Sequence, residues 1–160
     1  MMMRILVTVW GMFPIWLQTL LARILRPRFR VAVAAFVFDD EKRILLCEHT
    51  YRKSHPWGLP AGSLEYGEEP EDGIKRELWE ETGFNVQVER LLYADSAVEF
   101  HHISLIYLCR IIDGTFKPNI EVSSVKFYPL DQLPKLLPTE QTLIDKMLKK
   151  LSKELTHELA

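Results

Sequence analysis

The chain of 160 residues is 48% hydrophobic and 26% charged, which is the composition of one globular domain of ordinary size. These fractions exclude a disordered chain, and 7 glycines and 9 prolines exclude a fibrous or low-complexity sequence. The net charge of −2 excludes an overall basic surface for nucleic acid polymers. The two cysteines, Cys47 and Cys109, form no Cys-x-x-Cys pair, so we expect no disulfide framework or cysteine-rich zinc site, and a reducing, cytoplasmic compartment.

Residues 1–30 form an apolar and basic extension that contains five arginines and no acid. Its uncharged stretch, residues 5–22, would reach about 27 Å as a helix, which barely matches a bilayer core of roughly 30 Å. We expect a helix with seven apolar side chains on one face: Phe13, Trp16, Leu17, Leu20, Leu21, Ile24 and Leu25. Two interpretations stay open. One is peripheral membrane contact through residues 13–26, and the other is packing on the chain's own domain or on a second copy in a homodimer.

The middle of the chain predicts several strands. Residues 31–38 and 43–47 are apolar runs separated by a polar turn, which is typical of a hairpin. Pro56 and Pro60 allow only a short strand between them, and further strands are expected near 84–95, 102–112 and 124–129. A last helix is expected after Pro138, with Thr139 as N-cap and with buried Leu143, Met147, Leu148 and Leu151. The order of elements predicts an α/β or α+β layered domain.

A strongly acidic helix is predicted between Pro70, a first-turn proline, and Gly83, a residue just past a helix end. Residues 65–81 contain eight acids against two bases. Glu80 and Glu81 follow Glu77 by three and four residues, so their carboxylates crowd one face and repel one another. A solvated surface helix is one explanation, and a divalent metal site of hard oxygen ligands is the other.

The spacing of residues 62–84 resembles the box of the Nudix hydrolases, a MutT-like family. That box is a glycine, five residues, a glutamate, seven residues, then Arg-Glu-apolar-x-Glu-Glu-x-Gly-apolar. The chain matches each defining position with Gly62, Glu68, Arg76, Glu77, Leu78, Glu80, Glu81, Gly83 and Phe84. Seven fixed residues at about one in fifteen each give a chance match on the order of one in 10⁸ per starting point. Flanking similarity extends over residues 31–137, and we place the domain at 31–160, with residues 1–30 outside it.

The resemblance implies the Nudix fold, a mixed β-sheet between helices, and a site for Mg²⁺ or Mn²⁺. In this sequence the implied metal ligands are Glu77, Glu80, Glu81, the backbone carbonyl of Ala61 and, often through water, Glu68. Arg76 would orient and partly neutralise these carboxylates. Gly62 would form a backbone bend beside the metal, and Gly83 would stop the helix in a left-handed conformation.

The resemblance leaves the general base open. In the family this group comes either from the box helix, here Glu77 or Glu80, or from a later loop. Glu121 occupies such a loop position, and an ordinary loop acid is an equally good interpretation of it. Glu99 is a further, weaker candidate.

Four residues are candidates for substrate contact. Arg52 and Lys53 precede the box loop, where they could meet phosphates. Trp57 and Phe100 could stack on a nucleobase, although aromatic residues on strands more often belong to the core.

The function implied is hydrolysis of a diphosphate linkage in a nucleoside diphosphate derivative, giving a nucleoside monophosphate and a phosphorylated product. The substrate would be a nucleotide sugar, ADP-ribose or a (d)NTP rather than a nucleic acid polymer. A second hypothesis is a catalytically silent nucleotide-binding or sensor module of the same fold. A third is isomerisation of an isoprenoid diphosphate, which needs a catalytic cysteine in a loop beside the box.

Overall fold

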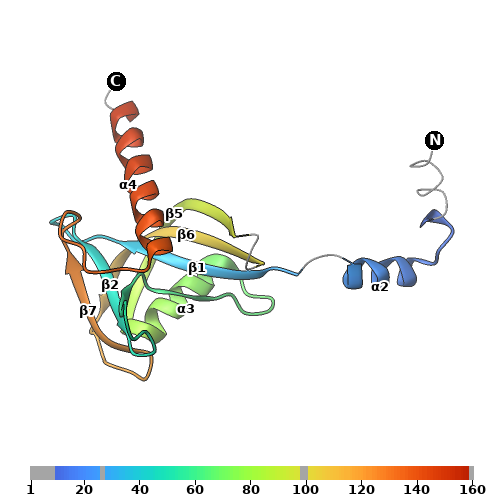
Figure 1. The fold of residues 1–160 in the computed structure, drawn as a ribbon, viewed down its shortest axis with the longest axis horizontal. Coiled ribbons are helices and arrows are strands. Elements are labelled where there is room, and N and C mark those ends of the chain that lie inside the picture. The colour runs from blue at the N-terminus through green and yellow to red at the C-terminus, as the bar shows by residue number, and fades with distance from the viewer. Residues whose placement is uncertain (1–9, 26–27, 98–100, 159–160) are drawn as a thin grey trace.

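The computed structural model describes residues 10–25, 28–97 and 101–158 of the chain (Figure 1). Its strands form two sheets, with helices on both sides of the domain and one helix apart from it. The elements are α2 (Ile15–Leu25), β1 (Arg30–Val37), β2 (Ile44–His49), β3 (Trp57–Gly58), β4 (Ala61–Ser63), α3 (Pro70–Thr82), β5 (Phe84–Ala97), β6 (His102–Gly114), β7 (Val122–Tyr128) and α4 (Pro138–Glu158).

The four-stranded sheet has the order β4-β1-β6-β5, in which β1 runs parallel to β6 and the other pairs are antiparallel. Strand β1 is apolar on both faces, so both faces must be covered. Its Val33 and Val37 pack with Ile74 and Leu78 of α3 in one core cluster. Its Phe36 belongs to a second cluster, which includes residues of α4. The predicted mixed sheet between helices is therefore confirmed.

The other sheet has the order β3-β2-β7 and is antiparallel throughout. Residues 31–38 and 43–47 were expected to pair as a hairpin, and this expectation is wrong beyond the turn. Only Phe38 and Ile44 form an isolated bridge, next to the hydrogen bond from the Asp39 amide to the Arg43 carbonyl. The reason is that β4 and β6 occupy both edges of β1, while β3 and β7 occupy both edges of β2.

Helix α4 begins at Pro138 instead of after it, so the prediction of Thr139 as N-cap is wrong. Proline suits a first helical turn because its missing N–H would have no partner there. Met147 is buried as predicted, and the fully buried Ile144, which the sequence pattern did not single out, lies beside it. The three other predicted apolar residues are half-buried and pack against this core cluster: Leu143, Leu148 and Leu151.

Helix α2 lies away from the sheets and from α3 and α4 (Figure 1). It contains no buried residue, and Trp16 and Ile24 are each 67% exposed. The structure therefore does not show the packing of this helix on its own domain that was one of the two expectations. Among the described residues, no helix is both long enough and apolar enough to cross a membrane.

Candidate active site

Helix α3 carries the clustered glutamates, and its ends are set by the two residues that predicted them. Pro70 occupies the first turn, and Gly83 follows the last turn with φ of 76°, a left-handed conformation that favours glycine. The Gly83 amide donates to the Trp79 carbonyl at 2.8 Å. On the inner face of the helix, the buried Ile74 and Leu78 hold it against the sheet, so the position of its carboxylates is fixed by packing.

Glu81 is the most buried acid of this helix, with 4% of its surface exposed. Its carboxylate accepts a hydrogen bond from the backbone amide of Ala61 at 3.1 Å. Burial raises the pKa of Glu81 to about 8, and repulsion from Glu77 and Glu121 adds to this effect. A buried carboxyl with a raised pKa is a group whose charged form requires a cation nearby.

Glu77 lies directly over Gly62 of β4. A methyl group at Gly62 would lie 1.9 Å from the carboxyl carbon of Glu77, so only glycine leaves room for that side chain. Burial also raises the pKa of Glu77, and the Arg76 guanidinium opposes the shift. Gly62 is therefore needed in the box because any larger residue would displace the Glu77 carboxylate.

Arg76 contacts three of the acids that the resemblance assigns to metal binding. Its guanidinium donates to Glu68 at 2.8 and 2.9 Å, to Glu77 at 2.9 Å and to Glu80 at 3.1 Å. A further hydrogen bond reaches the carbonyl of Ser63 at 3.1 Å. Hydrogen bonding to Arg76 lowers the pKa of Glu68 to about 2, which keeps that acid ionised and directed at the arginine. Glu68 thus orients Arg76 in this structure.

The loop before β7 brings Glu121 to the same site. Its charge raises the pKa of both Glu77 and Glu81, although it is far from them in the sequence. Asn119 fixes this loop: its amide donates to the carbonyls of Glu80 and Glu81 at 2.8 and 3.0 Å. Its side-chain oxygen accepts hydrogen bonds from the amides of Glu121 and Val122. Sequence reasoning missed Asn119, and its place two residues before Glu121 was the available signal.

The donor set fits a hard divalent cation. Glu77 and Glu81 offer carboxylate oxygens in an environment that disfavours their unpaired charge, and Glu80 follows on the same helix. Within the described part of the chain, no three His, Cys, Asp or Glu side chains stand close enough to hold a metal as they are. Glu80, half exposed, is turned to Arg76.

The candidate substrate contacts are spread over several places. Arg52 donates twice to Glu140 of α4 at 3.0 Å, across a space that Gly58 leaves open. Trp57 packs edge-on against Tyr128, with ring centroids 5.2 Å apart, which is a core contact. Lys53 is exposed, and Phe100 lies outside the described residues, as does Glu99.

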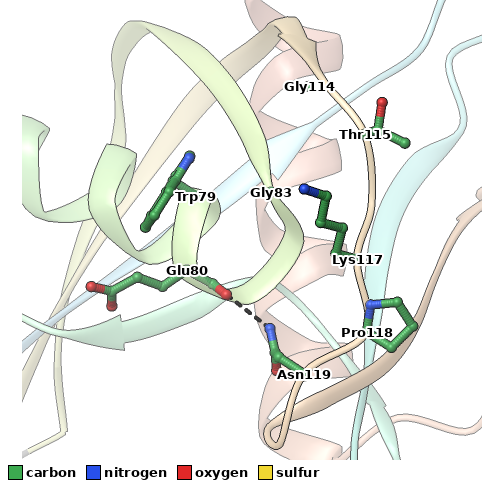
Figure 2. A pocket seen from close by; sticks show the side chains of 8 residues that line it. All are labelled: Trp79, Glu80, Gly83, Gly114, Thr115, Lys117, Pro118 and Asn119. Atoms are coloured by element: carbon green, nitrogen blue, oxygen red, sulfur yellow. Dashed lines mark hydrogen bonds between the residues drawn. The ribbon is translucent and has the colours of Figure 1, made fainter.

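A cavity of about 480 Å³ lies at the end of α3, where no substrate contact was predicted. Figure 2 shows Trp79 and Glu80 from the helix on one side, the segment 114–119 on the other, and the Asn119 amide directed at the Glu80 carbonyl. Trp79 is 59% exposed beside this cavity.

Both cysteines are free and buried. Burial raises the pKa of Cys47 well above its ordinary value and that of Cys109 to about 12. Neither thiol is therefore available as a thiolate nucleophile near neutral pH. This argues against isomerisation through a catalytic cysteine.

Comparisons with known proteins agree with the box. A model of the NUDIX domain matches residues 28–151. The ADP-ribose pyrophosphatase of Methanocaldococcus jannaschii is 32% identical over 122 residues, which cover 71% of this chain and 70% of that protein. The MutT-like protein of Streptomyces ambofaciens is 31% identical over 107 residues, covering 67% of this chain and 68% of that protein.

A third relative, the putative ADP-ribose pyrophosphatase YjhB of Bacillus subtilis, is 28% identical over 72% of this chain, and the chain spans 58% of its length. Among solved structures, a UDP-X diphosphatase matches with a TM-score of 0.70 and 29% identity, covering 85% of this chain and 71% of that one. The chain therefore belongs to the NUDIX domain family of pyrophosphohydrolases, as residues 62–84 predicted.

Proposed function

We propose that this protein is a metal-dependent hydrolase that cleaves the diphosphate linkage of a nucleoside diphosphate derivative, with residues 31–160 as its catalytic domain. The observation that carries the proposal is the pair of half-buried and buried carboxylates, Glu77 and Glu81, held over Gly62 and Ala61. Relatives named for ADP-ribose and UDP-X share a nucleoside diphosphate joined to a second group, and this class of substrate is the one we favour.

Nudix hydrolases generally use divalent metal ions, and the ion proposed here is Mg²⁺, with Mn²⁺ as the alternative. Glu77, Glu80 and Glu81, together with the Ala61 carbonyl, would hold it. When bound, such an ion supplies positive charge to phosphate oxygens and lowers the pKa of a water molecule.

The chain's own residues have three tasks in the reaction. Arg76 holds Glu68, Glu77 and Glu80 in place through four hydrogen bonds, and a fifth ties it to the Ser63 carbonyl. Packing of α3 fixes the carboxylates, which matters because phosphoryl transfer depends mainly on positioning and charge. Glu121 accepts the proton of the attacking water at its carboxylate as the water oxygen bonds to phosphorus. The bond from that phosphorus to the bridging oxygen breaks, and the products are a nucleoside monophosphate and a phosphorylated group.

The test is incubation of the full chain with ADP-ribose, UDP-sugars, dinucleotides and (d)NTPs, with Mg²⁺, Mn²⁺ or a chelator, and separation of the phosphate products. We expect turnover of a nucleoside diphosphate derivative that the chelator stops. Glu81→Gln should abolish it, whereas Glu71→Gln, which changes an exposed acid of the same helix, should not.

A silent binding module would behave differently in the same experiment. Nucleotides would bind without product, and Glu81→Gln would change no rate. The cost of burying clustered carboxylates argues against this alternative, because a site without turnover has no chemical need for them.

A further inference from the structure

Helix α2 presents an apolar stripe to solvent. Trp16, Leu20 and Ile24 follow one another at four-residue spacing, so they lie on one side of the helix. Their exposed fractions are 67%, 47% and 67%. An exposed row of large apolar side chains on a folded domain indicates a surface that contacts something else.

The charge around the stripe indicates which kind of partner surface α2 would contact. Arg23 lies in the last turn of α2, and Arg28 and Arg30 follow it, all three exposed. Residues 1–30 contain five arginines, and Asp39 is the first acid of the chain. Phe29, between two of these arginines, is 39% exposed. Apolar and basic residues are thus combined without acidic residues.

A second copy of the chain is a poor match for this segment. In a symmetric dimer in which α2 of one copy packs on α2 of the other, the same arginines would gather without an acid to pair with them. An anionic lipid surface has the opposite charge and a hydrocarbon layer below it. It also suits Trp16, because tryptophan side chains favour the boundary between headgroups and acyl chains.

We propose that α2 lies in the surface of a bilayer that contains anionic lipids. The stripe of Trp16, Leu20 and Ile24 enters the acyl boundary, and the exposed arginines contact lipid phosphates. With 11 residues, α2 is too short to cross a bilayer, so an orientation along the surface is the one its length allows. The surface is separate from the carboxylate site, so the two proposals fail independently.

The experiment uses the full chain and vesicles of phosphatidylcholine with and without phosphatidylglycerol, separated by sedimentation. We expect partition into the anionic vesicles that weakens with salt. Ile24→Ser should lower the partition about tenfold, because it removes buried apolar surface. Ile15→Ser is the matched control: Ile15 is 81% exposed and lies nine residues from Ile24, two and a half turns, and so on the opposite side of the helix.

Two further measurements decide between lipid and a second copy. The double variant Arg23→Gln and Arg28→Gln should lose binding to anionic vesicles and leave the weak binding to neutral ones unchanged. Sedimentation velocity without lipid should give the same mass for the unaltered chain and for Ile24→Ser. Hydrolysis of a soluble nucleotide should be equal in both, which separates a failure of lipid binding from a failure of the enzyme.

Three outcomes would overturn the proposal. The first is an absence of partition into either kind of vesicle. The second is an equal effect of Ile15→Ser and Ile24→Ser, which would deny a role to the stripe. The third is a dimer in the absence of lipid that Ile24→Ser dissociates, since the stripe would then bind a second copy.

Discussion

The side-chain oxygen of Asn119 accepts a hydrogen bond from the backbone amide of Glu121 at 2.9 Å. Through its amide group, the same side chain is joined to the carbonyls of Glu80 and Glu81. One residue therefore links the end of the carboxylate helix to the loop that carries the proposed base. The position of Glu121 depends in part on this link, because Glu121 is exposed and is otherwise anchored at its carbonyl, which accepts a hydrogen bond from the Thr50 amide at 2.9 Å.

Asn119→Ala removes the link and should lower kcat about tenfold, with a smaller change in KM, because a misplaced base reduces proton transfer more than binding. Steady-state kinetics on the best substrate of the panel measures both constants. Ser123→Ala is the control, since it removes a hydroxyl of the same region that bonds to Glu48. An unchanged kcat in Asn119→Ala would show that the loop holds its position without this residue.

Glu121→Gln tests the base directly. If Glu121 takes the proton of the attacking water, kcat should fall roughly 10²- to 10⁴-fold while the metal concentration needed for half-maximal activity stays similar. Glu48→Gln provides the comparison, because Glu48 is an acid on the neighbouring strand β2 that bonds to Ser123 and not to the site. A loss of less than threefold in kcat, which is about the scatter between variants, would indicate that Glu77 or Glu80 accepts the proton of the attacking water instead.

Gly62→Ala should abolish activity and leave the fold intact. The added methyl group meets the end of the flexible Glu77 side chain, which can rotate away. The carboxylate then leaves its place, so metal-dependent turnover should be lost with a change of Tm of only a few degrees. Activity assays and thermal unfolding of the same preparation measure the two effects.

Gly83→Ala is the counterpart for stability. Here the methyl group would meet the backbone carbonyl of Thr115 at 2.8 Å, at a residue with positive φ. We expect a loss of about 1–3 kcal/mol in the free energy of unfolding. The Thr115 carbonyl belongs to the backbone and cannot rotate away as a side chain can, and alanine is strained at a positive φ. Equal stability of both glycine variants would contradict the distinction drawn between them.

The Glu81 carboxyl should make the metal-free protein less stable as the pH rises. Its pKa is raised from 4.5 to about 8 in the folded state, so between these values the folded protein keeps a proton that the unfolded chain has released. The contribution is complete below about pH 4.5 and is lost as the pH rises toward 8, on the order of 5 kcal/mol.

Thermal unfolding with a chelator over this pH range measures the effect. Glu81→Gln should flatten the decline, and Glu80→Gln, at a half-exposed position, should not. His49 lies 3.9 Å from the Glu81 carboxylate, and burial lowers its pKa from 6.5 to about 4, so its own contribution to stability rises with pH between these values and opposes the decline. Added Mg²⁺ should restore stability at high pH, because it binds the ionised form. If the stability of Glu81→Gln declined with pH at the same slope as that of the unaltered protein, Glu81 would not be the group responsible.

The sequence predicted the box helix well because its signals are local. Pro70 and Gly83 act through their own backbone geometry, and the spacing of Glu77 and Glu81 follows from the helical repeat. The packing of β1 was also predictable in part, since an apolar run implies cover on both faces.

Contacts between distant segments were not predictable in this way. The pairing of β1 with β6 and the bond between Arg52 and Glu140 join parts of the chain that no local pattern relates. Two apolar runs with a turn between them favour a hairpin locally, and competition from other strands for the same edges decided otherwise. Asn119 was missed for the same reason, because its importance lies in which carbonyls its side chain reaches.

The parallel pairing of β1 with β6 also affects the order in which the molecule assembles. The whole box, from β4 to the end of α3, lies between these two strands in the sequence. During synthesis the central strand pair cannot close until β6 has been made, so the sheet under α3 remains incomplete while the acidic helix is already present. The complete site is therefore a late product of folding. The repulsion among the acids of α3 is present as soon as the helix forms, whereas the loop that brings Asn119 and Glu121 to them is made only afterwards.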